Sequence, residues 1–126
     1  MRRFVRIATT SVLALTTSAV ISQVQSKAPV SERFPQFENE MAKVWKTRIE
    51  PHQPLAMHHH DHPRVIIALT GGTVNIVDPA GHIEPHVWET GKAYWLPANL
   101  PGTVHSDVNA GEKPIEVMVV ELEKEK

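Results

Sequence analysis

The sequence contains no cysteine among its 126 residues. This absence excludes disulfide bonds, iron–sulfur clusters and thiolate zinc sites, so any metal must be held by His, Asp or Glu side chains. The sequence also shows no Ser-His-Asp set and no general base within its histidine motif. Chemistry performed by this chain is therefore expected to depend on a bound metal.

A strong charge of either sign is also missing. Three of the 13 Lys and Arg residues lie in the first six positions, so residues 27–126 carry 10 basic and 14 acidic side chains. This balance is mildly acidic and follows no pattern along the chain. Such a composition does not suggest a nucleic acid or an anionic membrane surface as a partner.

The sequence has no apolar run of the roughly 20 residues that a transmembrane helix needs. Residues 7–21 are apolar or small and carry no charge, and they follow a basic start (MRRFVR) and precede a polar tail. This order is typical of a secretory signal peptide. We therefore predict a signal peptide at residues 1–26, with an approximate end, and an exported protein that is periplasmic or extracellular.

The rest of the chain lacks a convincing helical pattern and contains most of the ten prolines. Short runs with period-two alternation, separated by turn residues, predict an all-β domain at residues 41–126, preceded by a polar arm at residues 27–40. The expected architecture is a small β-barrel or jelly-roll sandwich. The predicted strands cover residues 41–50, 55–60, 64–70, 73–78, 82–89, 92–96, 103–108 and 115–122. The third of these is continuously apolar, which predicts that both of its faces are covered.

Five of the eight histidines lie between Pro51 and Gly72. On a strand, His58 and His60 point to the same face about 6.6 Å apart, and His59 points to the other. Two imidazoles at this spacing are able to converge on one metal ion. A third ligand must come from another segment, and His105 is the candidate. His62 is a further candidate, although Asp61 and Pro63 indicate that the chain is turning there.

These residues resemble the cupins. The first cupin motif reads Gly-x5-His-x-His-x3-Glu-x6-Gly, and His58, His60 and Gly71 match it at the same spacing. The second reads Gly-x5-Pro-x-Gly-x2-His-x3-Asn. Gly91 and Pro97 match its first half, and its second half is matched by Gly102, His105 and Asn109. The resemblance extends from Trp45 to Leu122 and implies a cupin barrel with a metal held by three histidines.

Three positions depart from the motifs. His52 replaces the opening glycine, which should alter only a turn. Three extra residues separate Pro97 from Gly102, which could redirect His105. Arg64 replaces the carboxylate, which removes an anionic ligand and introduces a permanent cation. His62 is then an alternative fourth ligand.

The resemblance implies two kinds of function. The first is a metal-dependent, dioxygenase-like oxidoreductase acting on a small anionic substrate, with iron as the usual metal and Mn, Ni, Zn or Cu as alternatives. The second is a non-catalytic module that binds a metal or a small molecule. For Arg64 we expect an anionic partner, either Asp61 or another internal acid, a bound inorganic anion, or the substrate's carboxylate. The resemblance also implies a homodimer.

Overall fold

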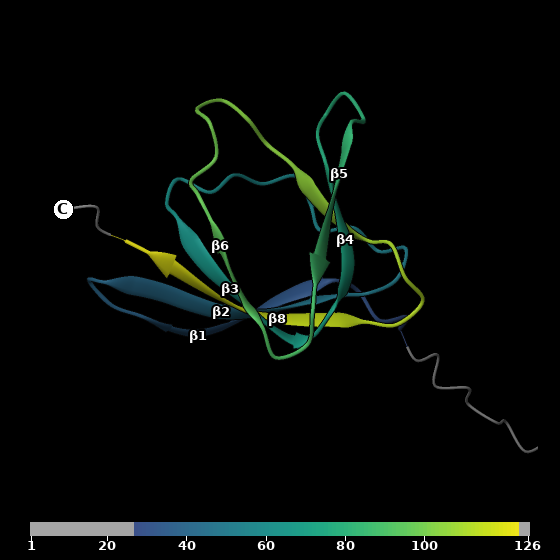
Figure 1. The fold of residues 1–126 in the computed structure, drawn as a ribbon, viewed down its shortest axis with the longest axis horizontal. Coiled ribbons are helices and arrows are strands. Elements are labelled where there is room, and N and C mark those ends of the chain that lie inside the picture. Colours follow the sequence, from purple (N-terminus) through teal and green to yellow (C-terminus); the bar gives the residue numbers. More distant parts are fainter. Residues whose placement is uncertain (1–26, 124–126) are drawn as a thin grey trace, which may run out of the picture.

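The computed structural model describes residues 27–123, which form two antiparallel sheets (Figure 1). The larger sheet has the strand order β1-β2-β8-β3-β6, and the smaller has the order β5-β4-β7. The strands are β1 (Glu32–Glu38), β2 (Ala42–Ile49), β3 (Arg64–Thr70), β4 (Gly72–Val77), β5 (Ile83–Trp88), β6 (Ala93–Leu96), β7 (Ser106–Asn109) and β8 (Ile115–Leu122). The predicted signal peptide lies outside the described residues. Within residues 27–123, no helix has the length and apolar character to cross a membrane.

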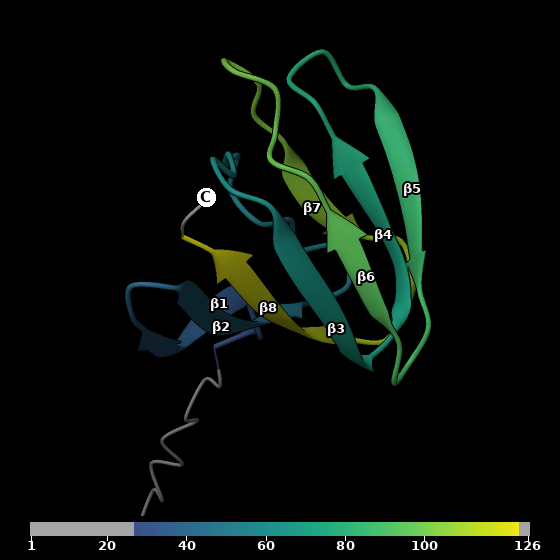
Figure 2. The same ribbon diagram turned by 60° about the vertical axis from the view of Figure 1, so that its left-hand side comes forward.

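The hydrophobic core lies between the two sheets. Figure 2 shows β8, β3 and β6 of the larger sheet as neighbours, and β4 and β5 of the smaller sheet as neighbours. In β2 the alternating residues Trp45, Thr47 and Ile49 are buried, as their period of two predicts. The alternating residues of β8 behave in the same way, because Ile115, Val117 and Val119 are all buried. Val74 and Trp88 close the core from the smaller sheet. The predicted all-β jelly-roll class is therefore confirmed.

Strand β3 corrects the expectation that both of its faces are covered. Its burial alternates: Arg64, Ile66 and Ala68 are buried, whereas Val65 and Ile67 are only partly covered. The reason is that β3 belongs to an antiparallel sheet, between β8 and β6, and no helix of residues 27–123 covers the outer face of this sheet. As a consequence, the side chain of Arg64 lies on the same inward face as Ile66.

The predicted polar arm contains β1, which pairs with β2 and extends the larger sheet. The register shifts between Pro35 and Phe37, so the proline sits beside an irregularity on an edge strand, where its missing N–H is tolerated. The strand expected at residues 55–60 is wrong. That segment follows Pro51 and Pro54 and forms an isolated bridge between His58 and His105.

Candidate metal centre

Two segments bring the motif histidines together. The connection between β2 and β3 carries His58 and His60, and His105 comes directly before β7. Paired backbone hydrogen bonds join His58 and His105, with N···O distances of 2.8 and 2.9 Å. The insertion after Pro97 does not displace His105. Instead, Asn99 from this insertion fixes the backbone of His60, accepting from its N–H at 2.8 Å and donating to its carbonyl at 2.9 Å.

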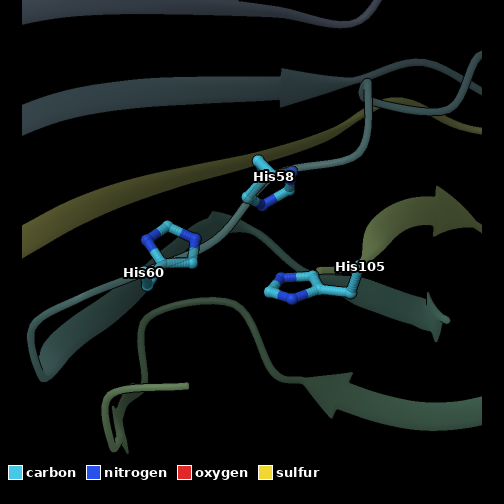
Figure 3. Close-up of side chains that lie close together, drawn as sticks. All are labelled: His58, His60 and His105. Atoms are coloured by element: carbon cyan, nitrogen blue, oxygen red, sulfur yellow. The ribbon is translucent and has the colours of Figure 1, made fainter. Parts of the chain in front are cut away.

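The three imidazoles point toward a common space between the sheets (Figure 3). Their centroids lie 4.4 Å apart for His58 and His105, 5.0 Å for His58 and His60, and 5.7 Å for His60 and His105. One ring nitrogen from each residue lies within 4.8 Å of the other two. Nitrogens bound tetrahedrally to one ion at about 2.1 Å are about 3.4 Å apart, so a shift of about 1 Å or less by each ring is sufficient.

Hydrogen bonds at the opposite ring nitrogens orient two of these imidazoles. His58 Nδ1 is 2.8 Å from the carbonyl oxygen of Ala56, and His60 Nδ1 is 2.9 Å from a carboxylate oxygen of Glu121. A neutral imidazole that donates from Nδ1 keeps a free lone pair on Nε2. Metal-ligating histidines show the same arrangement, in which a carbonyl or carboxylate fixes the ring. The Nε2 atom of His58 is buried without a hydrogen-bond partner. The donor set therefore fits a divalent cation.

Burial favours the neutral form of two of the centre's imidazoles, those of His58 and His105. Burial lowers the pKa of His58, and it lowers the pKa of His105 to about 4. Protons therefore compete with a metal for the ring nitrogen of His105 only at pH values well below about 6.5, the ordinary histidine pKa. Because this pKa is lower in the folded chain than in the unfolded chain, its contribution makes the metal-free fold more stable as pH rises from about 4 to 6.5.

Glu121 is the carboxylate that supports His60. Burial alone would raise the pKa of its carboxyl group. The hydrogen bond from His60 and the charges of His60, His62 and Arg64 outweigh burial, so the pKa is lowered. Glu121 therefore stays ionised and holds the imidazole of His60 in place.

Arg64 is buried beside the histidines. Its Nη1 donates a hydrogen bond to the carbonyl of Pro97 at 3.2 Å. Burial lowers the pKa of the guanidinium from its usual value, and the charges of Asp107 and Glu121 oppose this. Asp61, one of the expected partners, is instead 3.1 Å from His59 Nε2, and its side chain is 82% exposed. Of the anionic partners expected for Arg64, the internal acids whose charges act on its guanidinium are Asp107 of β7 and Glu121 of β8.

The remaining candidates lie outside the group. His59 contacts the carbonyl of Thr103 and Asp61. His62 is half-exposed and lies 3.9 Å from Glu123, so the structure does not bring it to the three histidines. Asn109, expected in a turn, is the buried last residue of β7, and its side-chain nitrogen donates to the carbonyls of Ile49 and Lys113.

Arg64 lines two of the hollows that adjoin the centre. A cavity of about 30 Å³ lies inside the barrel and is also lined by Arg33, Trp45, His60 and Asp107. A pocket of about 330 Å³ opens beside it, between His105 and the insertion at residues 97–100. The second has the volume of a small-molecule site. Arg64 is thus placed to contact a ligand that enters from the pocket.

Sequence reasoning missed Asp107. Its carboxylate is mostly buried, 3.7 Å from His58 Nε2 and 3.6 Å from His105 Nε2. The spacing His105-x-Asp107 repeats that of His58-x-His60, so a period of two places both side chains of each pair on one face. The signal was present, but it fell outside the family motif.

Known structures share this fold. No family model matches the sequence, and no curated protein matches it. A cupin domain from Bordetella pertussis Tohama I is 23% identical, aligned over 79% of this chain and 99% of its own, with a TM-score of 0.66. A double-stranded β-helix protein from Klebsiella pneumoniae is 20% identical, aligned over 84% of this chain and 88% of its own, with a TM-score of 0.57. An RmlC-like cupin from Methanocaldococcus jannaschii is 16% identical, aligned over 82% of this chain and 93% of its own, with a TM-score of 0.57. The chain therefore has the cupin fold, the double-stranded β-helix, and it carries a three-histidine group that is able to hold a metal.

Proposed function

We propose that this protein is an exported cupin that binds one divalent metal through His58, His60 and His105 and a small anionic ligand through Arg64. The observation that supports it best is the convergence of three imidazoles, of which those of His60 and His105 are buried and those of His58 and His60 are fixed at Nδ1. Three protein ligands leave positions open for a ligand molecule. Imidazole suits Fe, Ni, Cu and Zn, and of these iron is the metal that the cupin resemblance favours.

The proposal extends to a dioxygenase-like oxidoreductase. An iron ion in such a centre supplies the binding and activation of dioxygen. The chain's own residues would orient the substrate through Arg64 and exclude bulk water with the surrounding apolar side chains, such as Ile66 and Leu96. Oxygen uptake by the iron-loaded protein with small carboxylates, thiols and diketones tests this. If protein that binds metal takes up no oxygen with any of these compounds, the non-catalytic binding module is favoured. The guanidinium of Arg64, at the usual position of the carboxylate, also supports that alternative.

Replacing Arg64 with glutamine is expected to weaken the binding of a small carboxylate by about 10- to 150-fold, the equivalent of about 1.5–3 kcal/mol for a charged hydrogen bond. Metal should stay bound, and Arg64→Glu should tighten it by adding a carboxylate at the centre. Calorimetric titration of the metal-loaded protein with small carboxylates measures the first effect, and titration of the metal-free protein with metal measures the second. Arg48→Gln is the matched control, because Arg48 pairs with Glu116 on the partly exposed face of β2.

If Arg64→Gln leaves carboxylate binding unchanged and lowers the free energy of unfolding, Arg64 is a structural partner of Asp107 and Glu121. The ligand part of the proposal would then fail, while the metal part would stand.

Export is the second part of the proposal, and it is supported by the basic start and the uncharged run at residues 7–21. The mature protein recovered from its native cells is expected to begin between about residues 20 and 30. Mass spectrometry of the intact protein gives the first residue. Soluble protein that retains Met1 would contradict export.

A further inference from the structure

Asp107 faces the space between two of the candidate ligands. Its two carboxylate oxygens are directed at different rings: Oδ2 lies 3.7 Å from His58 Nε2, and Oδ1 lies 3.6 Å from His105 Nε2. Both separations exceed the length of a hydrogen bond. A nitrogen and an oxygen that share a tetrahedral ion at about 2.1 Å are about 3.4 Å apart. The observed spacing is therefore close to that of two ligands on one metal.

His58 and Asp107 each have a buried polar atom without a hydrogen-bond partner. In the described part of the chain, His58 Nε2 and Asp107 Oδ1 are buried side-chain atoms that lack a hydrogen-bond partner. Leaving such an atom unpaired costs about 1–3 kcal/mol, and more when the group is charged. A cation between them would satisfy both atoms at once. Protonating His58 alone would not, because the separation is too long for a direct bond.

We propose that Asp107, in β7, is the fourth, anionic ligand of the metal centre. It would take the role of the motif's carboxylate, whose position at the start of β3 is occupied by Arg64. This inference rests on the proposed metal function. It also accounts for the arginine, since an isolated buried cation would repel a divalent ion. The charges of Asp107 and Glu121 act on Arg64 against that of Arg33, so the two acids equal the two arginines in number. A bound divalent metal would then leave a net positive site, which suits an anionic ligand.

The experiment uses the full mature chain, without a tag, stripped of metal and titrated with Co²⁺ against a competing chelator. Asp107→Asn is expected to lower Co²⁺ affinity by about 100-fold or more, since even the loss of a residue behind a ligand costs 10- to 100-fold. The visible absorption of bound Co²⁺ should change with the ligand set. The matched control is Asp61→Asn, whose side chain is 82% exposed and pairs with His59. It should leave affinity and spectrum unchanged.

A second pair of variants keeps the test independent of folding losses. Because the chain has no cysteine, Asp107→Cys introduces a single thiol, and a thiolate is itself a metal ligand. Bound Co²⁺ should then show a near-ultraviolet thiolate-to-metal absorption band, which Asp61→Cys should lack. If the wild type binds Co²⁺ while Asp107→Asn keeps its affinity and spectrum and Asp107→Cys shows no band, Asp107 is not a ligand. A wild type that binds no metal would instead refute the proposed function.

Discussion

Replacing His58, His60 or His105 with alanine is expected to lower metal affinity by more than about 100-fold. Each imidazole is one of only three nitrogen donors in the group, and the loss of a residue that merely orients a ligand already costs 10- to 100-fold. Metal content after equilibration with a limiting metal buffer measures the effect. The three variants should lose metal to a similar degree, because no other histidine of residues 27–123 belongs to the group.

His59→Ala is the control for this series, since it removes an imidazole from the same segment. His59 contacts the carbonyl of Thr103 and the carboxylate of Asp61, away from the other three rings. Metal affinity should be unchanged. An equal loss from His59→Ala would mean that the segment is shifted by one residue and that the other face carries the ligands.

Trp45→Ala is expected to lower the free energy of unfolding by about 3–5 kcal/mol, the usual cost of truncating a buried tryptophan. Trp45 is 6% exposed in the core, its ring lies parallel to that of His60 at 6.2 Å between centroids, and the guanidinium of Arg33 lies 5.4 Å from its ring centre. The variant should therefore also weaken metal binding, because the support beneath His60 is lost. Denaturant unfolding, followed by a probe other than tryptophan fluorescence, measures the stability.

Trp95→Ala is the matched control for this prediction. Trp95 lies on β6, 57% exposed, and pairs with Val65 on the outer face of the sheet. Truncating it should cost less than about 1 kcal/mol, the scale of a single cross-strand pair. If the two tryptophan variants lose equal stability, the assignment of Trp45 to the core would be contradicted.

The strands that the sequence predicted well are those with one buried face. In β2 the period of two shared by Trp45, Thr47 and Ile49 matches the buried face. Strand β8 is apolar on both faces, and the structure shows that Ile115, Val117 and Val119 are the residues on its buried face. Strand β1 could not be predicted in this way, because it lies exposed at the edge of the sheet and its residues have no core to face. Residues 55–60 were predicted as a strand because they are partly apolar. In the structure this segment belongs to neither sheet and forms an isolated bridge from His58 to His105.

The part of the candidate site that depends on motif spacing was predictable from the sequence. The interval between His58 and His60, and the position of His105, follow from the motifs, and the structure brings all three together. The environment of Arg64 depends on tertiary structure, since Glu121 lies 57 residues away and reaches it through the pairing of β3 with β8. The placement of Asp107 also depends on tertiary structure, since the bridge between His58 and His105, directly before β7, brings it to the histidine segment.

The most direct test of the account is the metal content of protein purified without a tag, measured by elemental analysis before and after reloading. We predict about one divalent ion per chain, lost on treatment with a chelator and restored by Fe, Mn, Ni, Zn or Cu. Reloading should raise thermal stability, by about 2.7 kcal/mol when free metal is 100 times its dissociation constant. Protein that contains no metal, takes up none of these ions and unfolds at the same temperature in their presence would contradict the metal centre.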